Sequence, residues 1–168
     1  GIMGKPMSKN LIKAGHELTV YDIVETPLGE LEKEGAKVAA SSKEVAARSD
    51  LTITMLPDSP DVEKAALGSN GVFEGIRAGS TYIDMSTISP VTTKKLAEAA
   101  KAKGVRILDA PVSGGERGAI DGTLTIMVGG AREVFDDCLP VFQAMGKNIV
   151  YCGGIGSGQV VKACNQVL

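Results

Sequence analysis

Three polar side chains near the end of the chain have the spacing of one helical face. Lys162, Asn165 and Gln166 stand at i, i+3 and i+4, so an α-helix presents them on the same side. An ammonium within hydrogen-bond reach of a carbonyl oxygen can stabilise negative charge that builds up there and then protonate that oxygen. Burial that lowers the pKa of the lysine toward neutrality favours this exchange. Most helical lysines are solvated, so the spacing alone leaves both interpretations open.

The first four residues and Asp22 form a second candidate set. Gly1-Ile2-Met3-Gly4 precedes a helical pattern and resembles the tail of a G-x-G-x-x-G turn whose first glycine is missing. Glycines let the backbone approach a pyrophosphate, whose charge meets the helix N-terminus. Asp22 ends the next predicted strand, about 20 residues on, where a carboxylate accepts hydrogen bonds from the adenosine ribose. A carboxylate there also repels a 2′-phosphate. The set indicates NAD rather than NADP, although each feature alone equally fits a plain turn or a surface strand end.

Short apolar strands alternate with helices along the chain, without internal repeats or a linker. Strands are expected at 18–22, near Val38, and at 51–56, 81–84, 105–108, 124–128 and 149–151. The first helix is expected to end at Gly15 and to carry one apolar stripe of Met3, Met7, Leu11 and Ala14. Three further helices are expected to begin at a polar residue followed by proline, namely Thr26-Pro27, Ser59-Pro60 and Ser89-Pro90, the last of them ending at Lys103-Gly104. Another is expected to begin at Ser41, with a capping box to Glu44. The last two are expected to begin at Arg132, ending at Met145-Gly146, and at about Gln159.

This alternation predicts an α/β fold of the Rossmann type, with a doubly wound, mostly parallel sheet. Ligands bind such sheets at the carboxyl ends of the strands, and the candidate residues fall there or in the loops that follow. The strand that should precede the glycine turn lies at the centre of this fold and is missing. We expect residues 1–153 to form a cofactor-binding domain that lacks its first strand, and residues 154–168 to begin an interdomain helix.

Composition excludes several other classes of protein. The chain is 43% hydrophobic and 23% charged, and its formal net charge of -2 gives no reason to expect nucleic acid as a partner. No apolar run approaches the ~20 residues of a membrane-spanning helix, and no secretion leader is recognisable. Three widely spaced cysteines (Cys138, Cys152 and Cys164) fit reduced thiols in the cytoplasm better than disulfides or a zinc site. No metal site is predicted, and His16, after the first helix, is interpreted as structural.

Four segments together resemble the β-hydroxyacid dehydrogenase family, which includes relatives of 3-hydroxyisobutyrate dehydrogenase, tartronate semialdehyde reductase and 6-phosphogluconate dehydrogenase. The segments are Gly1-Ile-Met-Gly-Lys-Pro-Met-Ser-Lys-Asn10, Asp84-Met-Ser-Thr-Ile-Ser-Pro90, Asp109-Ala-Pro-Val-Ser-Gly-Gly115 and Gly156-Ser-Gly-Gln-Val-Val-Lys-Ala-Cys-Asn-Gln166. They span nearly the whole chain in the family's order. The third segment, with Gly118–Thr123 after it, is most similar to tartronate semialdehyde reductase.

The resemblance implies a role for each candidate residue. It assigns catalysis to Lys162 and Asn165, with Asn165 also holding the substrate, while Gln166 assists or faces solvent. The implied substrate segment is Ser113, Gly114 and Gly115, where a hydroxyl and backbone N–H groups can receive a carboxylate. The implied cofactor residues, with Thr87 close to the nicotinamide, are Gly1, Ile2, Met3, Gly4, Asp22, Leu56, Pro57, Asp61 and Thr87.

The activity that the resemblance implies is reversible hydride transfer between NAD(H) and a small 3-hydroxy acid, with tartronate semialdehyde reduction to D-glycerate as the first expectation. Alternatives are a 3-hydroxyisobutyrate dehydrogenase, a 6-phosphogluconate dehydrogenase or imine reductase, and a non-catalytic binding scaffold. Asp22 in place of an NADP-binding arginine argues against a 6-phosphogluconate dehydrogenase, and retention of Lys162 argues against an imine reductase and against a non-catalytic scaffold. The family adds an all-helical second domain with dimer contacts, so we expect a homo-oligomer, and a chain that is inactive or poorly soluble on its own.

Overall fold

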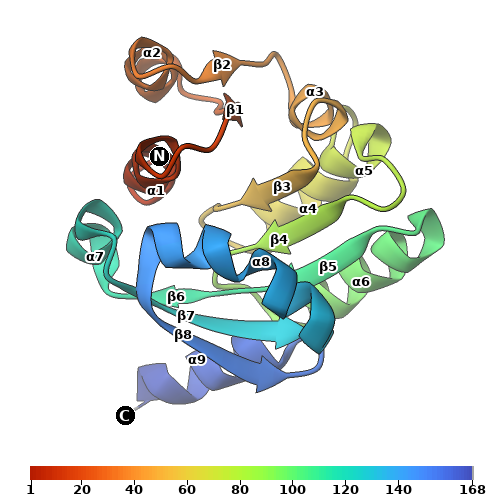
Figure 1. Cartoon of the computed structure of the whole chain (residues 1–168). Coiled ribbons are helices and arrows are strands. Elements are labelled where there is room, and N and C mark those ends of the chain that lie inside the picture. The colour runs from red at the N-terminus through yellow and green to blue at the C-terminus, as the bar shows by residue number, and fades with distance from the viewer. Residues whose placement is uncertain (168) are drawn as a thin grey trace.

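The structure is a computed structural model that describes residues 1–167. The helices are α1 (Gly4–Lys13), α2 (Glu25–Lys33), α3 (Ser42–Ala47), α4 (Ser59–Leu67), α5 (Val72–Gly75), α6 (Pro90–Lys103), α7 (Gly115–Asp121), α8 (Arg132–Met145) and α9 (Ser157–Val167). The strands are β1 (Thr19–Val20), β2 (Lys37–Val38), β3 (Leu51–Thr54), β4 (Thr81–Asp84), β5 (Arg106–Asp109), β6 (Val112–Ser113), β7 (Leu124–Gly130) and β8 (Gly146–Gly153). Figure 1 shows strands and helices in alternation, as predicted for the Rossmann type. None of the helices within 1–167 has the length and apolar character to cross a membrane.

The larger sheet is mixed, and its parallel part ends in a row of polar residues. Strands β3, β4 and β5 are parallel and in register, so their last residues Thr54, Asp84 and Asp109 lie side by side. Strand β7 is antiparallel to β5, and β8 is parallel to β7. Strands β5 and β6 follow one edge of β7 in continuous register, since Asp109 lies opposite Gly129 and Ser113 opposite Thr125. The sheet is mostly parallel, as predicted, and the reversed β7 brings the segment 109–113 along its edge.

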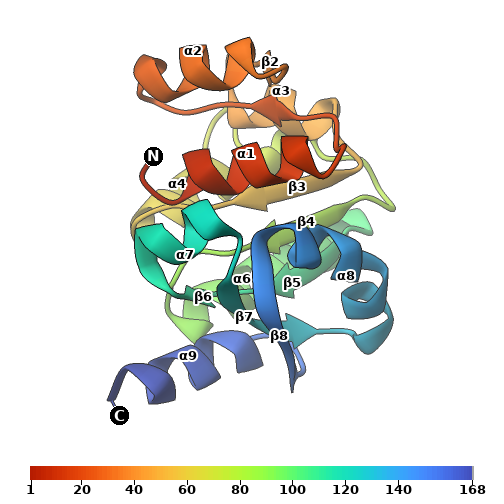
Figure 2. The ribbon, with the colours of Figure 1, turned by 60° about the vertical axis from the view of Figure 1, so that its left-hand side comes forward.

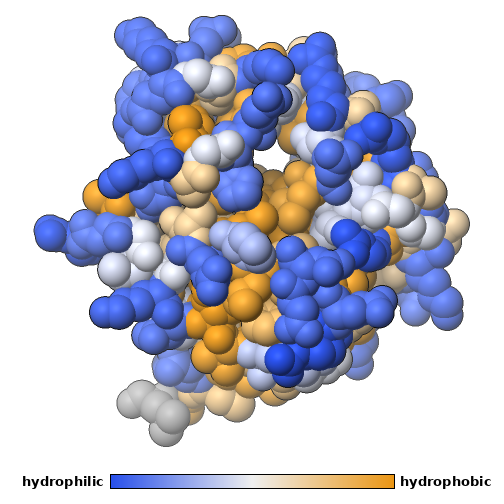
Figure 3. Space-filling view, viewed as in Figure 1, coloured by the Kyte–Doolittle hydropathy of each residue, from blue (hydrophilic) through white to orange (hydrophobic). Residues whose placement is uncertain are grey.

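Strands β1 and β2 form a separate two-stranded sheet. Within residues 1–167, β1 pairs only with β2 and β3 pairs only with β4, so each has one open edge. Both strands line a cavity of about 1220 Å³. Figure 1 shows β1, β2, α1 and α2 set apart from β3, and Figure 3 shows an opening through the molecule on that side. The Rossmann order places its first strand between these two, so the gap coincides with the predicted position of the missing strand, which stays a prediction.

Helices cover both faces of the larger sheet, which gives two apolar cores. On one face α1 and α8 pack through residues such as Met7, Leu11 and Phe142. The other face is covered by α4 and α6, around Tyr82 and Leu96. Because successive strand residues point to opposite faces, Ile83 belongs to the first core and its neighbour Tyr82 to the second. Figure 2, turned by 60°, shows α1 and α8 on one side of the strands and α9 along the far edge.

Helices whose ends are encoded locally follow the prediction. The Ser89 side chain accepts a hydrogen bond from Val91 N, Pro90 occupies the first turn, and Gly104 ends α6 with a φ of 65°. The bounds of α8 also match. At α3 the Ser41 hydroxyl caps Glu44 N, but the Glu44 carboxylate accepts from Ala40 N, so the capping box is displaced by one residue.

Other predicted boundaries were wrong. Helix α2 begins at Glu25 after Val24, so Thr26 is not its cap, and Pro27 lies in the first turn, where a missing N–H costs nothing. Ala14 is an exposed C-cap rather than part of the apolar stripe. Strands β1 and β3 are shorter than 18–22 and 51–56, since each has a neighbour on one side. Strand β5 is shifted by one residue, and β7 and β8 are longer because they pair with each other. The short elements α5, β6 and α7 were not predicted.

Candidate functional site

The glycine turn and Asp22 meet at the start of α1. Lys5 N donates to Gly1 O at 3.0 Å, and α1 begins at Gly4. The Gly1 nitrogen lies 2.7 Å from Asp22 Oδ2, and Val24 N donates to Asp22 Oδ1 at 3.0 Å. Burial raises the pKa of Asp22, whereas the backbone hydrogen bonds from Val24 and Ile23 lower it. Asp22 is therefore an anionic acceptor beside a helix N-terminus, as a ribose site requires.

Most of the cofactor candidates line one cavity. Gly1, Gly4, Asp22, Leu56, Pro57 and Asp61 all border the 1220 Å³ space. Asp22 also borders a neighbouring cavity of about 570 Å³ between β2 and α2. Ile2 is 70% exposed and its side chain points away from the core. The glycine turn and an anionic acceptor thus stand on one side of this gap, and the apolar residues that follow β3 stand on the other.

Thr87 lies outside that cavity lining, in the loop after β4. Its side chain is exposed, whereas both neighbours, Ser86 and Ile88, are buried. Ser86 Oγ accepts a hydrogen bond from Leu56 N at 2.9 Å, which ties this loop to the end of β3. The structure therefore brings Thr87 to the same edge of the sheet as Leu56 and leaves its hydroxyl accessible.

The predicted substrate segment forms a fixed corner between β6 and α7. Ser113 ends β6, and Gly114 and Gly115 have φ of 130° and 61°, values that favour glycine. A Cβ on Gly114 would lie 3.3 Å from the Leu124 side chain, so the corner is also tightly packed. Ser113 is held by its pairing with Thr125 of β7, and Gly115 is held as the first residue of α7.

Lys162 is a buried cation on α9. Its side chain is 7% exposed, and Nζ donates to Gln166 Oε1 at 3.1 Å. Within residues 1–167 no carboxylate lies within salt-bridge distance of this ammonium. Asn165 and Gln166 are exposed on the next turn, and Gln166 contributes the contact with Lys162. A buried ammonium with donors to spare is suited to receive an oxygen ligand.

Sequence reasoning missed two buried polar residues that hold α9 in place. Asp109 is fully buried and accepts hydrogen bonds from Gly156 N at 2.7 Å and Gln159 N at 2.9 Å. The Gln159 side chain donates to Ser86 O at 2.7 Å and accepts from Ile88 N at 3.1 Å. Both residues stand in segments that carry the family resemblance, and Asp109 also ends a strand, as Asp22 does. Neither signal indicated the contacts of Gln159, because its partners lie about 70 residues away in the chain.

Asp84, beside Asp109 in the sheet, is the most perturbed carboxyl in this row. Its Oδ1 accepts from Thr54 Oγ1 and Ser86 Oγ, whereas Oδ2 is buried without a partner among residues 1–167. Burial raises the pKa of Asp84 to about 6, against the opposing effect of these hydrogen bonds.

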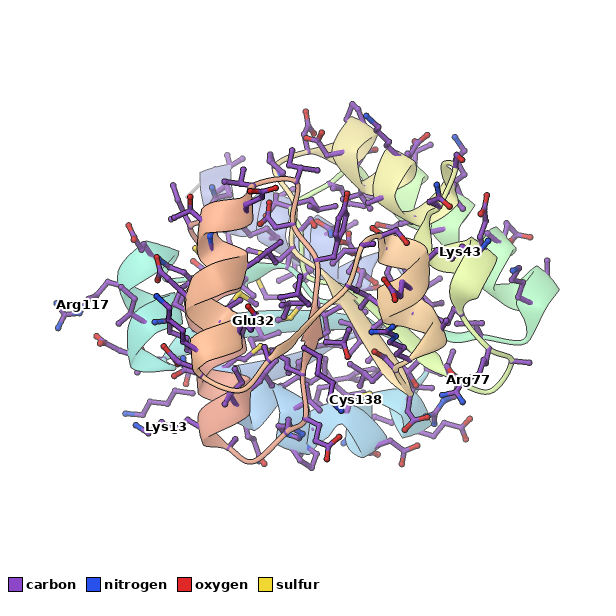
Figure 4. The ribbon with its side chains drawn as sticks, turned by 90° about the horizontal axis from the view of Figure 1, so that it is seen from above. Lys13, Glu32, Lys43, Arg77, Arg117 and Cys138 are labelled. Carbon is purple, nitrogen blue, oxygen red and sulfur yellow. The ribbon has the colours of Figure 1, made fainter. Side chains whose placement is uncertain are left out.

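Several charged residues lie at the periphery of the structure. Lys5 pairs with Glu30 on α2, and Lys9 pairs with Glu34, the C-cap of that helix. Figure 4 shows Lys13, Arg77 and Arg117 pointing outward, away from the sheet. His16 follows Gly15, and its backbone N–H closes α1 onto Leu11 O.

Residues 1–154 match the family described as the NAD binding domain of 6-phosphogluconate dehydrogenase. A probable mitochondrial 3-hydroxyisobutyrate dehydrogenase of Dictyostelium discoideum is 45% identical over 168 residues, all of this chain and 52% of that protein. An NAD-dependent L-serine dehydrogenase of Pseudomonas aeruginosa is 44% identical, again over the whole chain and 56% of the relative.

Among solved structures, the Mycobacterium tuberculosis 3-hydroxyisobutyrate dehydrogenase with L-serine superposes with a TM-score of 0.93 at 38% identity. The match covers 98% of this chain and 56% of that one. The chain thus spans somewhat more than half the length of the relatives it matches, and its fold is that of their N-terminal, cofactor-binding part.

Proposed function

This chain belongs to the β-hydroxyacid dehydrogenase family, and we propose that it is the NAD-binding part of an oxidoreductase that transfers hydride reversibly between nicotinamide and a small 3-hydroxy acid. The observation that carries the proposal is the buried Lys162 ammonium, which lacks a carboxylate partner within residues 1–167 and stands on a helix bonded to the carboxyl ends of β4 and β5. A solvated surface lysine would have neither property.

Each proposed residue has a physical part in binding or proton transfer. Bound NADH would supply hydride, with its electron pair, to the carbonyl carbon of the substrate. Lys162 Nζ stabilises the charge on the carbonyl oxygen and gives it a proton, so that a hydroxyl forms; in the reverse direction the neutral amine takes that proton. Asn165 holds the substrate from the next turn of α9. Ser113, with the N–H groups of Gly114 and Gly115, receives the substrate carboxylate.

The residues at the other end of the site fit the cofactor. Gly1, Ile2, Met3 and Gly4 would present backbone N–H groups to the pyrophosphate at the start of α1. Leu56, Pro57 and Asp61 would border the adenosine and ribose along the cavity, and Thr87 the nicotinamide. Asp22 would bind the ribose hydroxyls and repel a 2′-phosphate, which favours NAD over NADP.

We propose that the substrate is tartronate semialdehyde, which is reduced to D-glycerate. The support is that segment 109–123 resembles the corresponding part of tartronate semialdehyde reductases. The second candidate is 3-hydroxyisobutyrate, with L-serine beside it, because relatives that are 45% and 44% identical to this chain carry those names. All three present a carboxylate and an oxygen on the β-carbon, so the same ammonium and carboxylate pocket serve each. Rates for the three substrates on the full-length protein, followed by NADH absorbance with NADPH as the control, would rank them.

The direct test of the proposed function compares two lysine variants of the full-length protein. Lys162→Ala is expected to lower kcat by about 100-fold or more while NADH still binds, because the proton donor is lost and the cofactor site is not. Lys94→Ala, at an exposed position of α6, is the matched control and should keep wild-type turnover. Unchanged turnover in Lys162→Ala would reject Lys162 as the proton donor, whereas absence of turnover in the wild type on every hydroxy acid would favour a non-catalytic scaffold.

For the whole protein we propose three further features. A parallel strand leading into Gly1 fills the gap between β1 and β3, and 1–153 then forms a complete cofactor domain. Residues 154–168 begin an interdomain helix that continues into a helical domain, through which the protein forms a homo-oligomer. We also propose a cytoplasmic location, supported by three free cysteines, with light scattering and cell fractionation as the tests.

A further inference from the structure

Gln159 occupies an unusual position for an uncharged polar side chain. It stands in the first turn of α9 and is 2% exposed, one turn before Lys162. Its amide nitrogen donates to Ser86 O at 2.7 Å, and its amide oxygen accepts from Ile88 N at 3.1 Å. Both hydrogen bonds go to backbone groups of the loop between β4 and α6. One side chain therefore satisfies an acceptor and a donor of that loop at the same time.

The two backbone groups lie on either side of Thr87. Ser86 and Ile88 are buried and held, while the Thr87 side chain between them is exposed. The hydrogen bonds fix the peptide groups on either side of Thr87, in the loop that follows the carboxyl end of β4. An amide in a buried site is costly unless both its groups are bonded, and here both are.

The same helical turn is fixed from below by Asp109. Its carboxylate accepts from the N–H groups of Gly156 and Gln159, so a negative charge faces the positive end of the α9 dipole. Gly158 has no room for a side chain, since a Cβ there would lie 2.4 Å from Met127 O. With Asp109 beneath it and the Ser86–Ile88 loop beside it, the turn that precedes Lys162 has little freedom to shift.

We propose that Gln159 is a positioning residue that sets Lys162 against Thr87, and hence the proton donor against the nicotinamide. The inference rests on the proposed function. Hydride and proton must reach adjacent atoms of one carbonyl group, and a displacement of about 1 Å can cost about 100-fold in rate. Gln159 links α9, which carries the Lys162 ammonium, directly to the loop that carries Thr87. Such a link limits the displacement of the two groups relative to each other more tightly than if the helix and the loop each packed against the sheet independently.

Three substitutions of Gln159 separate the contributions of its two bonds. Gln159→Leu keeps the approximate volume and removes both. Gln159→Glu keeps the acceptor for Ile88 N but places a carboxylate oxygen against Ser86 O, and protonation of that carboxyl restores the donor. Gln159→Asn shortens the side chain by one methylene. Gln143→Leu, at an exposed position of α8, is the matched control for loss of an amide.

The first measurement uses the full-length protein and needs no activity. Amide hydrogen exchange should show Ile88 protected in the wild type and in Gln143→Leu, and at least tenfold faster exchange in Gln159→Leu. Exchange at Phe142, in the buried core, reports global stability and should accelerate less than exchange at Ile88. Equal protection of Ile88 in wild type and Gln159→Leu would overturn the link between α9 and the loop.

The second measurement uses the full-length enzyme. Gln159→Leu is expected to lower kcat by about 10- to 100-fold with the Kd for NADH changed by less than about threefold, and to raise the primary isotope effect of deuterated NADH. Gln159→Glu should recover activity as the pH falls, a profile that loss of packing alone would not give. Wild-type kcat in Gln159→Leu would refute the positioning role. A wild-type enzyme inactive on every hydroxy acid would refute the proposed function, and the exchange result would still decide the link.

Discussion

Replacement of Gly158 by alanine tests whether α9 sits directly on the strand ends. A Cβ at this position would lie 2.4 Å from Met127 O, 2.8 Å from Asp109 Oδ2 and 3.0 Å from Asp109 O. The first two distances fall below 3.0 Å, so atoms must move, and all three neighbours are backbone or a hydrogen-bonded carboxylate with little freedom to do so. The helix has to lift by about 1 Å to bring the first contact to 3.4 Å.

The cost follows from what that displacement breaks. Asp109 binds Gly156 N at 2.7 Å and Gln159 N at 2.9 Å, and a 1 Å lift takes both beyond hydrogen-bond length. Hydrogen bonds to a charged group contribute about 1.5–3 kcal/mol each, and leaving a carboxylate buried without partners is costlier still. Alanine returns about 1 kcal/mol through its higher helix propensity. The free energy of unfolding should therefore fall by about 2–5 kcal/mol in Gly158→Ala.

Urea denaturation of the 168-residue chain measures this effect. With an m value of about 2 kcal/mol per molar urea, the unfolding midpoint should move down by about 1–2.5 M. Gly154→Ala is the matched control, since among the described residues no atom outside its neighbours lies within 4 Å of the added Cβ. A change below about 0.5 kcal/mol is expected there. Equal midpoints for Gly158→Ala and the wild type would show that α9 does not rest on these atoms.

Four further predictions concern charge, cofactor choice, thiol reactivity and the open strand edges. Burial raises the pKa of Asp84 from 3.8 to about 6, so the folded state binds a proton there more tightly than the unfolded state. The contribution of Asp84 to the free energy of unfolding should be greatest below about pH 4 and fall by up to about 3 kcal/mol as the pH rises through 6, and pH-dependent urea melts should lose this component in Asp84→Asn. Asp22→Ala in the full-length enzyme should raise kcat/KM with NADPH relative to NADH by about tenfold or more, and an unchanged ratio would contradict the ribose assignment. Burial raises the pKa of Cys138 to about 11, so iodoacetamide at pH 8 should label the exposed Cys164 quickly and Cys138 only on unfolding, as peptide mass spectrometry can check. A β-branched peptide of about five residues ending in glycine should raise the melting temperature of the chain in a concentration-dependent way, while its proline-substituted form should not; no shift at millimolar peptide would count against a strand between β1 and β3.

Features encoded by neighbouring residues could be predicted, and those that depend on distant partners could not. Helix α6 was predicted at both ends because its cap, its proline and its terminal glycine are adjacent in the chain. The lengths of β1 and β3 were overestimated because a strand extends only as far as a neighbour pairs with it, and the sequence does not reveal which edge stays open. The antiparallel course of β7 likewise depends on a pairing with β5, which is not visible in the strand's own residues.

The candidate site likewise contains residues that local motifs indicate and residues whose role depends on distant contacts. The residues that a motif names, from Gly1 and Asp22 to Lys162, are found at one edge of the sheet or on α9, but their roles remain proposals. Asp109 and Gln159 escaped prediction because their contacts join residues 47 to 73 positions apart. Nothing in the local pattern around a glutamine indicates that its amide will be buried against a distant loop.

The hydrogen bonding of Asp109 also explains how a buried ammonium can stay available on α9. A carboxylate at the start of the helix would be an obvious ion-pair partner for Lys162, one turn further on. Instead its two oxygens are engaged by Gly156 N and Gln159 N, and two glycines without room for a Cβ, Gly129 and Gly158, let the helix approach closely enough for this. The negative charge is thereby balanced by the helix dipole rather than by the lysine. Lys162, bonded to the neutral Gln166, keeps donors for an incoming oxygen, as proton transfer to a substrate requires.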